Sequence, residues 1–209
     1  MRNALRARVA SLVFERRLDV RTAGRVELDE LGVAGRDRWR YEPAEWRALP
    51  RILHRGEIGP EDVFLDFGSG MGRVVLQAAR YGPRRVIGVE LAPELDEIAR
   101  DNVERNRERL KCNDIELHTA DAIEFELPDD VTIFFFNNPF TGEIFARVME
   151  KIVASIEANP RHVRIVYRNP LEHEAVIATE RFRLARTWQR GSWRGRPRGV
   201  AIHLYESVS

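Results

Sequence analysis

The sequence has one cysteine, few lysines and no long apolar run, and each shortage excludes a class of protein. With Cys112 alone among 209 residues, no internal disulfide can form and no cysteine cluster can hold zinc. The five histidines show no metal-ligand spacing, so we expect no metal. The longest apolar run in the middle of the chain, residues 131–136, is too short to span a membrane. Arginines interrupt residues 1–14, which therefore do not resemble a signal peptide, and we expect a cytoplasmic protein without a membrane partner.

The formal net charge of +1 hides an uneven distribution of charged residues. Residues 1–54 carry a net charge of +4, residues 55–160 carry −9, and residues 161–209 carry +6. A simple nucleic-acid-binding domain is basic throughout, so this pattern makes nucleic acid an unexpected partner. Of the 34 basic residues, 32 are arginine, and such an excess over lysine is typical of a GC-rich genome.

Apolar patterns after residue 55 alternate between those of strands and those of helices. This alternation favours a mostly parallel sheet with right-handed crossovers. The last two strands have no helical pattern between them, so we expect them to form an antiparallel hairpin. The expected strands are residues 63–67, 85–90, 115–119, 131–136, 162–167, 182–189 and 200–206, and the expected helices are residues 72–81, 93–110, 143–158 and 172–178.

The first 54 residues are predicted to form a helical cap on this sheet. Residues 4–18 show helical apolar spacing, residues 19–43 are irregular, and a second helix is expected from Ala44 to Leu53, after a proline. Trp39 and Tyr41 are interpreted either as a lid over a ligand or as core residues of the cap. The expected organisation is a cap over residues 1–54 and a ligand-binding α/β domain over residues 55–209.

A glycine-rich turn joins the first expected strand to the next helix. It reads Asp66-Phe67-Gly68-Ser69-Gly70-Met71-Gly72. Glycine permits positive φ and a close approach of backbone to ligand, and the start of a helix offers free amide groups. A dinucleotide fingerprint would place its third glycine at position 73, where this chain has Arg73, so a nicotinamide oxidoreductase is disfavoured.

Polar residues also follow the next three strands, where ligands of such sheets bind. Glu90 ends the second strand and can accept hydrogen bonds from both hydroxyls of a ribose. Asp121 and the amide of Ala122 follow the third strand, where they can contact an adenine ring. Asn137 and Asn138 follow the fourth strand, next to the expected place of a reactive group.

Together these features resemble the class I methyltransferases that depend on S-adenosylmethionine (SAM). The resemblance covers roughly residues 60–206 and implies a Rossmann-like, seven-stranded α/β sheet with a C-terminal antiparallel hairpin. It also implies SAM as cofactor and S-adenosylhomocysteine (SAH) as product. The implied cofactor-binding residues are Asp66, Gly68, Ser69, Gly70, Gly72, Glu90, Leu91, Asp121, Ala122 and Asn137, and the implied catalytic residues are Asn137 and Asn138.

Within that superfamily, the turn and the FFFNNPF stretch are similar to two groups. One group consists of bacterial methyltransferases with an Asn-Pro-Phe motif after strand four. The other, more distant, is the histone-lysine methyltransferase family that lacks a SET domain, which shares the Gly-Ser-Gly turn and the paired Asn. Amine methyltransferases usually carry Asn/Asp-Pro-Pro-aromatic here, and Asn138 replaces the first proline.

Each of these positions also has an interpretation without a ligand. The glycines can form a simple tight turn, Glu90 can be a surface acid, and Asp121 can cap a short helix. The two asparagines are also good turn residues. The seven arginines near the C-terminus can line a solvated hairpin face; they are Arg181, Arg183, Arg186, Arg190, Arg194, Arg196 and Arg198.

The leading functional hypothesis is a SAM-dependent enzyme that methylates a small molecule. Its acceptor is expected to be an anionic metabolite or natural product, because basic segments flank the acidic cofactor-binding region. A side-chain carbonyl of Asn137 or Asn138 would orient an amine acceptor, whereas Glu143 or His173 would serve as base for a hydroxyl or acid. A protein-lysine or other macromolecular methyltransferase and a non-enzymatic SAM sensor are the alternatives, and the oligomeric state is left open.

Overall fold

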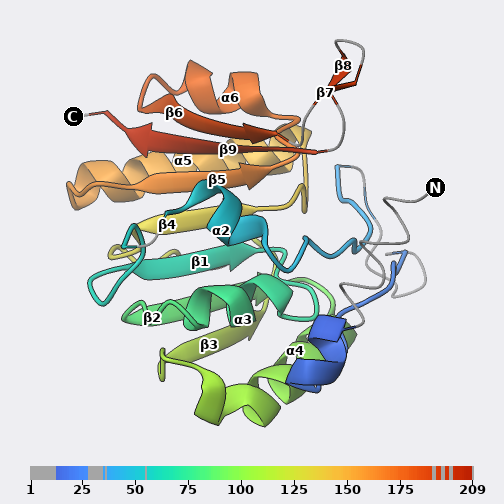
Figure 1. Ribbon diagram of the computed structural model, residues 1–209. Coiled ribbons are helices and arrows are strands. Elements are labelled where there is room, and N and C mark those ends of the chain that lie inside the picture. The colour runs from blue at the N-terminus through green and yellow to red at the C-terminus, as the bar shows by residue number, and fades with distance from the viewer. Residues whose placement is uncertain are drawn as a thin grey trace.

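A seven-stranded sheet forms the centre of the fold (Figure 1). The structure is a computed structural model that describes residues 13–27, 35, 37–54, 56–189, 192–193, 196–197 and 200–208. The strand order is β3-β2-β1-β4-β5-β9-β6, and a separate short ribbon pairs β7 with β8. The bounds are β1 (Val63–Phe67), β2 (Arg85–Glu90), β3 (Ile115–Thr119), β4 (Ile133–Phe136), β5 (Arg164–Arg168), β6 (Phe182–Gln189), β7 (Ser192–Trp193), β8 (Arg196–Pro197) and β9 (Ala201–Ser207).

Helices cover both faces of the sheet, which explains why β1 and β4 are buried along their whole length and are apolar except for Asp66 of β1. α2 (Ala48–Ile52) and α3 (Arg73–Ala79) pack on one face, together with Val103 of α4 (Pro93–Asn106). α5 (Gly142–Ala158) and α6 (His173–Ala178) pack on the other. The phenylalanines of β4 alternate between the two cores, with Phe135 on the α3 side and Phe134 and Phe136 on the α5 side.

The observed sheet confirms the expected fold class. β5 and β6 both pair antiparallel with β9, so β9 is the one reversed strand of the seven-stranded sheet. The structure shortens the helix expected over residues 93–110, because its last turn is the 3-10 helix η1 (Arg107–Arg109). No described helix is both long enough and apolar enough to cross a membrane.

The second helix expected in the cap begins four residues later than its sequence predicts, at Ala48. Several backbone carbonyls of the residues before it accept hydrogen bonds from side chains that are distant in sequence. The carbonyl of Glu42 accepts from Asn137, that of Ala44 from Arg73, and that of Glu45 from Gln77. These contacts tie residues 42–45 to the core, and the carbonyl of Glu45 also accepts from the amide of Ala48 at 2.9 Å.

The described N-terminal residues pack directly on the α/β core. Residues 13–18 are helical, and residues 1–12 of the expected first helix lie outside the described residues. Leu18, Val20, Ala44 and Trp46 belong to the same buried cluster as α2 and α3. The proposed division between a cap and a domain at residues 54 and 55 stays a prediction.

Candidate functional site

The glycine-rich turn lies at the carboxyl end of β1 and bends back over the end of β2. The amides of Gly68 and Ser69 both donate to the carbonyl of Val89, at 2.8 and 3.1 Å. Gly70 has a φ of 53°, and a Cβ atom there would lie 2.2 Å from the ring of Tyr41. Only glycine therefore allows the backbone to pass so close to that ring. Gly72 precedes α3, where it takes a left-handed conformation at the N-cap.

Glu90 holds the turn in place from the end of β2. Its carboxylate accepts hydrogen bonds from the amide of Gly70 at 2.8 Å and from the amide of Ala92 at 3.0 Å. Glu90 is buried, and burial raises the pKa of its carboxyl, although the backbone hydrogen bonds act in the opposite direction. It is therefore not the surface acid that the alternative interpretation describes.

Asp66, the carboxylate of the turn, is deeply buried, with 2% of its surface exposed. Burial raises the pKa of Asp66 well above its ordinary value, and the nearby charge of Glu90 raises it further. A cation placed next to both groups would reverse these two effects. The electrostatics of this corner therefore favour a positively charged ligand.

Asp121 sits after β3 and makes two kinds of contact. One carboxylate oxygen accepts from the amide of Ile123 at 3.0 Å, so Asp121 does cap a local turn. The other oxygen forms an ion pair with Arg38, which the sequence had not indicated. Ala122 is half-buried beside it and lines the same pocket.

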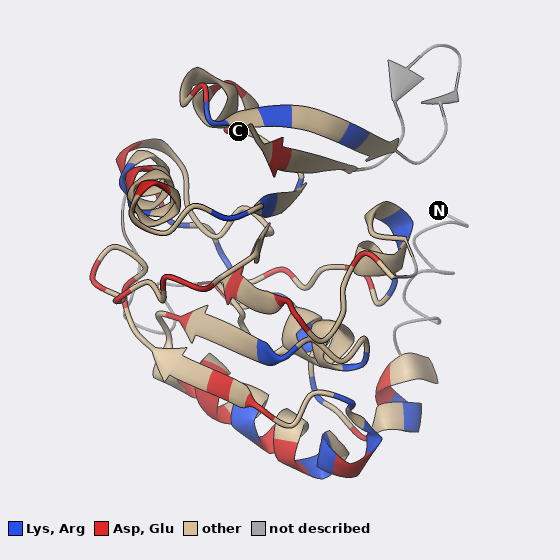
Figure 2. Cartoon of the chain, turned by 90° about the vertical axis from the view of Figure 1, so that its left-hand side faces the viewer, with Lys and Arg blue, Asp and Glu red and all other residues tan. Residues whose placement is uncertain are grey.

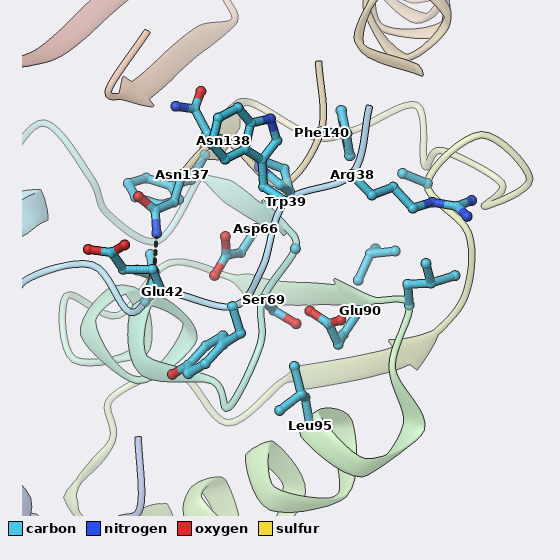
Figure 3. Close-up of a pocket in the computed structure, with 18 of the residues that line it drawn as sticks. Arg38, Trp39, Glu42, Asp66, Ser69, Glu90, Leu95, Asn137, Asn138 and Phe140 are labelled. Atoms are coloured by element: carbon cyan, nitrogen blue, oxygen red, sulfur yellow. Dashed lines mark hydrogen bonds between the residues drawn. The ribbon is translucent and has the colours of Figure 1, made fainter. Parts of the chain in front are cut away.

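The two asparagines after β4 differ in their surroundings. The Asn137 amide group donates to the carbonyl of Glu42 at 2.7 Å, and its carbonyl oxygen accepts from Arg168 at 2.7 Å. Asn138 is buried with a φ of 49°, and its Oδ1 has no hydrogen-bond partner among the described residues. Figure 3 shows the Asn138 amide directed away from Asp66 and Glu90.

Residues 37–45, which we call the strap, cross the carboxyl edge of the sheet. The Trp39 amide donates to the carbonyl of Pro139, and the Thr141 amide donates to the carbonyl of Asp37. Tyr41 packs on the glycine turn, and its hydroxyl donates to the carbonyl of Thr22 at 2.8 Å. The strap therefore ties the N-terminal residues to the loop after β4.

The strap and the four strand ends enclose one pocket (Figure 3). Its empty volume is about 860 Å3, a figure that includes space open to solvent. Eight of the ten residues predicted to bind the cofactor line it: Asp66, Gly68, Ser69, Glu90, Leu91, Asp121, Ala122 and Asn137. Asn138 also lines it, whereas Gly70 and Gly72 shape the turn behind. Trp39 and Tyr41 line the pocket from the strap side.

Two candidate bases of the sequence lie elsewhere. His173 begins α6, and its Nδ1 is 2.7 Å from the hydroxyl of Tyr205. Glu143 is exposed in the first turn of α5. Neither is among the described residues that line the pocket.

The arginines near the C-terminus whose side chains are described already pair with carboxylates. Arg183 contacts Glu206 at 2.7 Å, Arg186 contacts Glu57 at 2.8 Å, and Arg181 pairs with a glutamate of α5. These contacts favour a solvated hairpin face at this part of β6. The remaining members of the predicted run, Arg190, Arg194, Arg196 and Arg198, lie outside the described side chains.

Sequence reasoning missed several residues that hold the strap. Arg38, Glu42 and Arg168 contact predicted site residues across more than 30 positions of sequence. Arg73 was noted only because it is not glycine, yet it is buried and bonds Glu15 at 2.8 Å. No local pattern marks such partners, because their pairing exists only after the strands have assembled.

Comparison with known proteins decides the family. The family described as "Histone methylation protein DOT1" matches residues 41–189, which include every residue placed in the pocket except Arg38, Trp39 and Arg40. The chain belongs to the DOT1 family. This membership confirms the expected resemblance to class I SAM-dependent methyltransferases and, more distantly, to the histone-lysine methyltransferases without a SET domain. The expected enzyme class and cofactor, a methyltransferase that uses SAM, follow from the same match.

The individual relatives are methyltransferases by their descriptions. The chain is 32% identical over 120 residues to a "Histone-lysine N-methyltransferase, H3 lysine-79 specific" of Dictyostelium discoideum, a match that covers 53% of the chain and 6% of the relative. It is 33% identical over 81 residues to a "Probable ribosomal RNA small subunit methyltransferase A" of Methanosarcina barkeri, covering 39% and 26%. The chain therefore spans only a small part of the length of these relatives.

Solved structures show the same fold. The structure of TYW2 from P. horikoshii in complex with MeSAdo has a TM-score of 0.58 and 14% sequence identity. The match covers 80% of this chain and 65% of that one. The Rossmann-like methyltransferase fold is therefore shared beyond the DOT1 family.

Proposed function

We propose that this chain transfers the methyl group of SAM to an amine nitrogen, and that the amine is a lysine side chain of a protein. The observation that carries the proposal is the single pocket in which Asp66, Glu90 and Asp121 meet the two asparagines. The name of the Dictyostelium relative supports lysine as the acceptor.

The residues present fit SAM. The buried carboxylate of Asp66 favours a cation, as the SAM ammonium is, and Glu90 retains lone pairs for the ribose hydroxyls. Ser69 lines the pocket with a buried Oγ that has no partner among the described residues, so a ligand group can satisfy it. Asp121 and the Ala122 amide would contact the adenine. When bound, SAM supplies an electrophilic methyl group on a sulfonium.

The chain contributes mainly alignment and desolvation. The pocket is also lined by apolar groups, among them Trp39, Pro139, Phe140 and Ile144. Such surroundings favour a neutral amine over an ammonium, and only the neutral amine has the lone pair that forms the new bond. We assign to the Asn138 carbonyl the role of accepting an N–H of that amine. Alignment of this kind is worth roughly 7–11 kcal/mol of the barrier.

A specific feature also supports the small-molecule acceptor expected from the sequence. The strap lies across the pocket and limits the space through which a bulky acceptor can enter. In favour of a protein acceptor, Trp39 is 48% exposed at the rim of the pocket, where a protein surface can contact it. We therefore keep a small-molecule acceptor as the second candidate. RNA, named in the archaeal relative, is a third acceptor class that the test includes.

Transfer of isotopically labelled methyl groups tests the proposal. Purified chain and labelled SAM are incubated with a cell extract that has been separated into protein, RNA and small-molecule fractions, and each fraction is analysed by mass spectrometry. The proposal predicts label on lysine in the protein fraction. Label in the small-molecule fraction alone would establish the second candidate, and label in no fraction would contradict enzymatic transfer and leave a SAM sensor.

The variant Asn138→Ala tests the role of the acceptor end. We expect its turnover to fall roughly 10²-fold, because the acceptor loses its alignment, while its SAM affinity changes little. Isothermal titration calorimetry and the labelled assay measure the two quantities separately. An equal loss of SAM affinity would instead make Asn138 a cofactor-binding residue.

A further inference from the structure

Arg168 stands at the carboxyl end of β5, one strand beyond the asparagines, and is 9% exposed. Its Nε donates to a carboxylate oxygen of Glu45 at 2.8 Å, and its Nη1 donates to the Asn137 carbonyl at 2.7 Å. Burial raises the pKa of Glu45, but the hydrogen bond and charge of Arg168 outweigh burial and hold that pKa below its usual value. Arg168 thus joins β5, the loop after β4 and the strap.

The contact with Arg168 determines which way the Asn137 amide points. A guanidinium only donates hydrogen bonds, so it accepts only the orientation in which the Asn137 oxygen faces Arg168. The amide nitrogen then faces the carbonyl of Glu42, to which it donates at 2.7 Å. Both ends of the Asn137 side-chain amide are therefore engaged. Of the two asparagine side-chain carbonyls, that of Asn138 has no hydrogen-bond partner among the described residues.

We propose that Arg168 is a positioning residue for methyl transfer. By fixing Asn137 and the strap, it sets the place of the neighbouring Asn138 and the shape of the acceptor end of the pocket. This inference rests on the proposed function, and it assigns to Arg168 no contact with SAM or with the acceptor. Arg168 is not among the described residues that line the pocket.

The geometry requires arginine at this position. The two acceptors, Glu45 and Asn137, lie on different segments, and the planar guanidinium reaches both with separate nitrogen atoms. A lysine keeps the charge but offers one compact ammonium group in place of the planar fork, so it cannot reproduce both contacts. The variant Arg168→Lys therefore removes the alignment while it retains the charge near Glu45.

Arg164→Lys provides a matched control on the same strand. Arg164 begins β5 at the edge opposite the pocket, and its side chain is 12% exposed in an ion pair with Asp62 at 2.7 Å. The two substitutions thus remove the same chemical group from two similarly buried arginines, each of which is paired with a carboxylate. The measurements are the SAM dissociation constant, kcat and KM for the acceptor, and the side-chain amide resonance of Asn137, assigned by its loss in Asn137→Ala.

We expect Arg168→Lys to shift the Asn137 amide resonance and to lower kcat at least about tenfold, with SAM affinity within about threefold of wild type. In Arg164→Lys the resonance and kcat should stay near wild type. Adding Asn137→Ala to Arg168→Lys should lower kcat little further, because both changes break the same contact.

Three results would overturn the inference: an unmoved Asn137 resonance in Arg168→Lys, equal losses of kcat in the two lysine variants, or fully additive effects of Arg168→Lys and Asn137→Ala. Failure of the proposed function is recognised separately. A wild-type chain that transfers no methyl group would contradict that function, and loss of the alignment would still be read from the Asn137 resonance.

Discussion

Two buried carboxylates, Asp66 and Glu90, stand at the ends of adjacent strands and face one pocket. Burial raises the pKa of both groups, and the charge of Glu90 raises the pKa of Asp66 further. In a pocket for an uncharged ligand, this arrangement would be an unbalanced cost. It becomes useful when the ligand is a cation, because the ligand then stabilises the ionised form that the protein alone disfavours.

SAM binding should accordingly release a proton. In the free protein the raised pKa lets Asp66 hold its proton at pH values where an ordinary aspartate is ionised, and a bound cation lowers that pKa. Affinity for SAM should therefore increase with pH until Asp66 is ionised in the free protein. Calorimetry in two buffers of different ionisation enthalpy, between about pH 5 and 8, measures the released proton. Asp66→Asn should remove most of this release, whereas no release in wild type at any pH would contradict the account.

At the scale of elements, the regular strands and helices were predictable and the strap was not. The solid apolar run of β4 and the alternation of strands with helices come from burial on both faces, which sequence patterns report directly. The strap is held by hydrogen bonds that Asn137, Arg73 and Gln77 donate to its carbonyls, and these partners are distant in sequence. The site divides in the same way: the candidate residues at the ends of β1 to β4 could be located from sequence, but Arg38 and Arg168, whose partners are distant in sequence, could not.

The buried contact of Arg73 with Glu15 should hold the N-terminal residues to α3. Arg73 also bonds the hydroxyl of Thr22 and the carbonyl of Ala44. Arg73→Met would leave the buried carboxylate of Glu15 without its cationic partner, with only the hydrogen bonds from Thr22, which should lower the free energy of unfolding by roughly 3–5 kcal/mol. Urea denaturation measures this change.

The exposed pair of Arg105 with Asp101 on α4 provides the control for that prediction. Arg105→Ala should cost less than about 0.5 kcal/mol, because exposed pairs four residues apart contribute little. If the two variants lowered the free energy of unfolding equally, the buried ion pair would not hold the N-terminal residues as we describe.

At the scale of the whole molecule, the uneven charge of the three segments has more than one origin. Among the acidic residues of the middle segment, only Asp66, Glu90 and Asp121 line the pocket. Charged residues of both signs instead cover the outer side of α4, at the bottom of the cartoon (Figure 2). The described arginines of β6 pair with glutamates, so they give an anionic acceptor no support. Net charge by segment alone therefore does not identify the acceptor.

The central claim is that this pocket binds SAM through the carboxylates of the strand ends, and a calorimetric titration with SAM tests it most directly. We expect one site per chain, and an affinity at least about tenfold lower in Glu90→Ala, which removes both the contact with the ribose and the support of Gly70. Asp101→Ala, an exposed acid on α4, should bind as wild type does. Absence of SAM binding by the wild-type chain, or equal affinity in all three proteins, would contradict the claim.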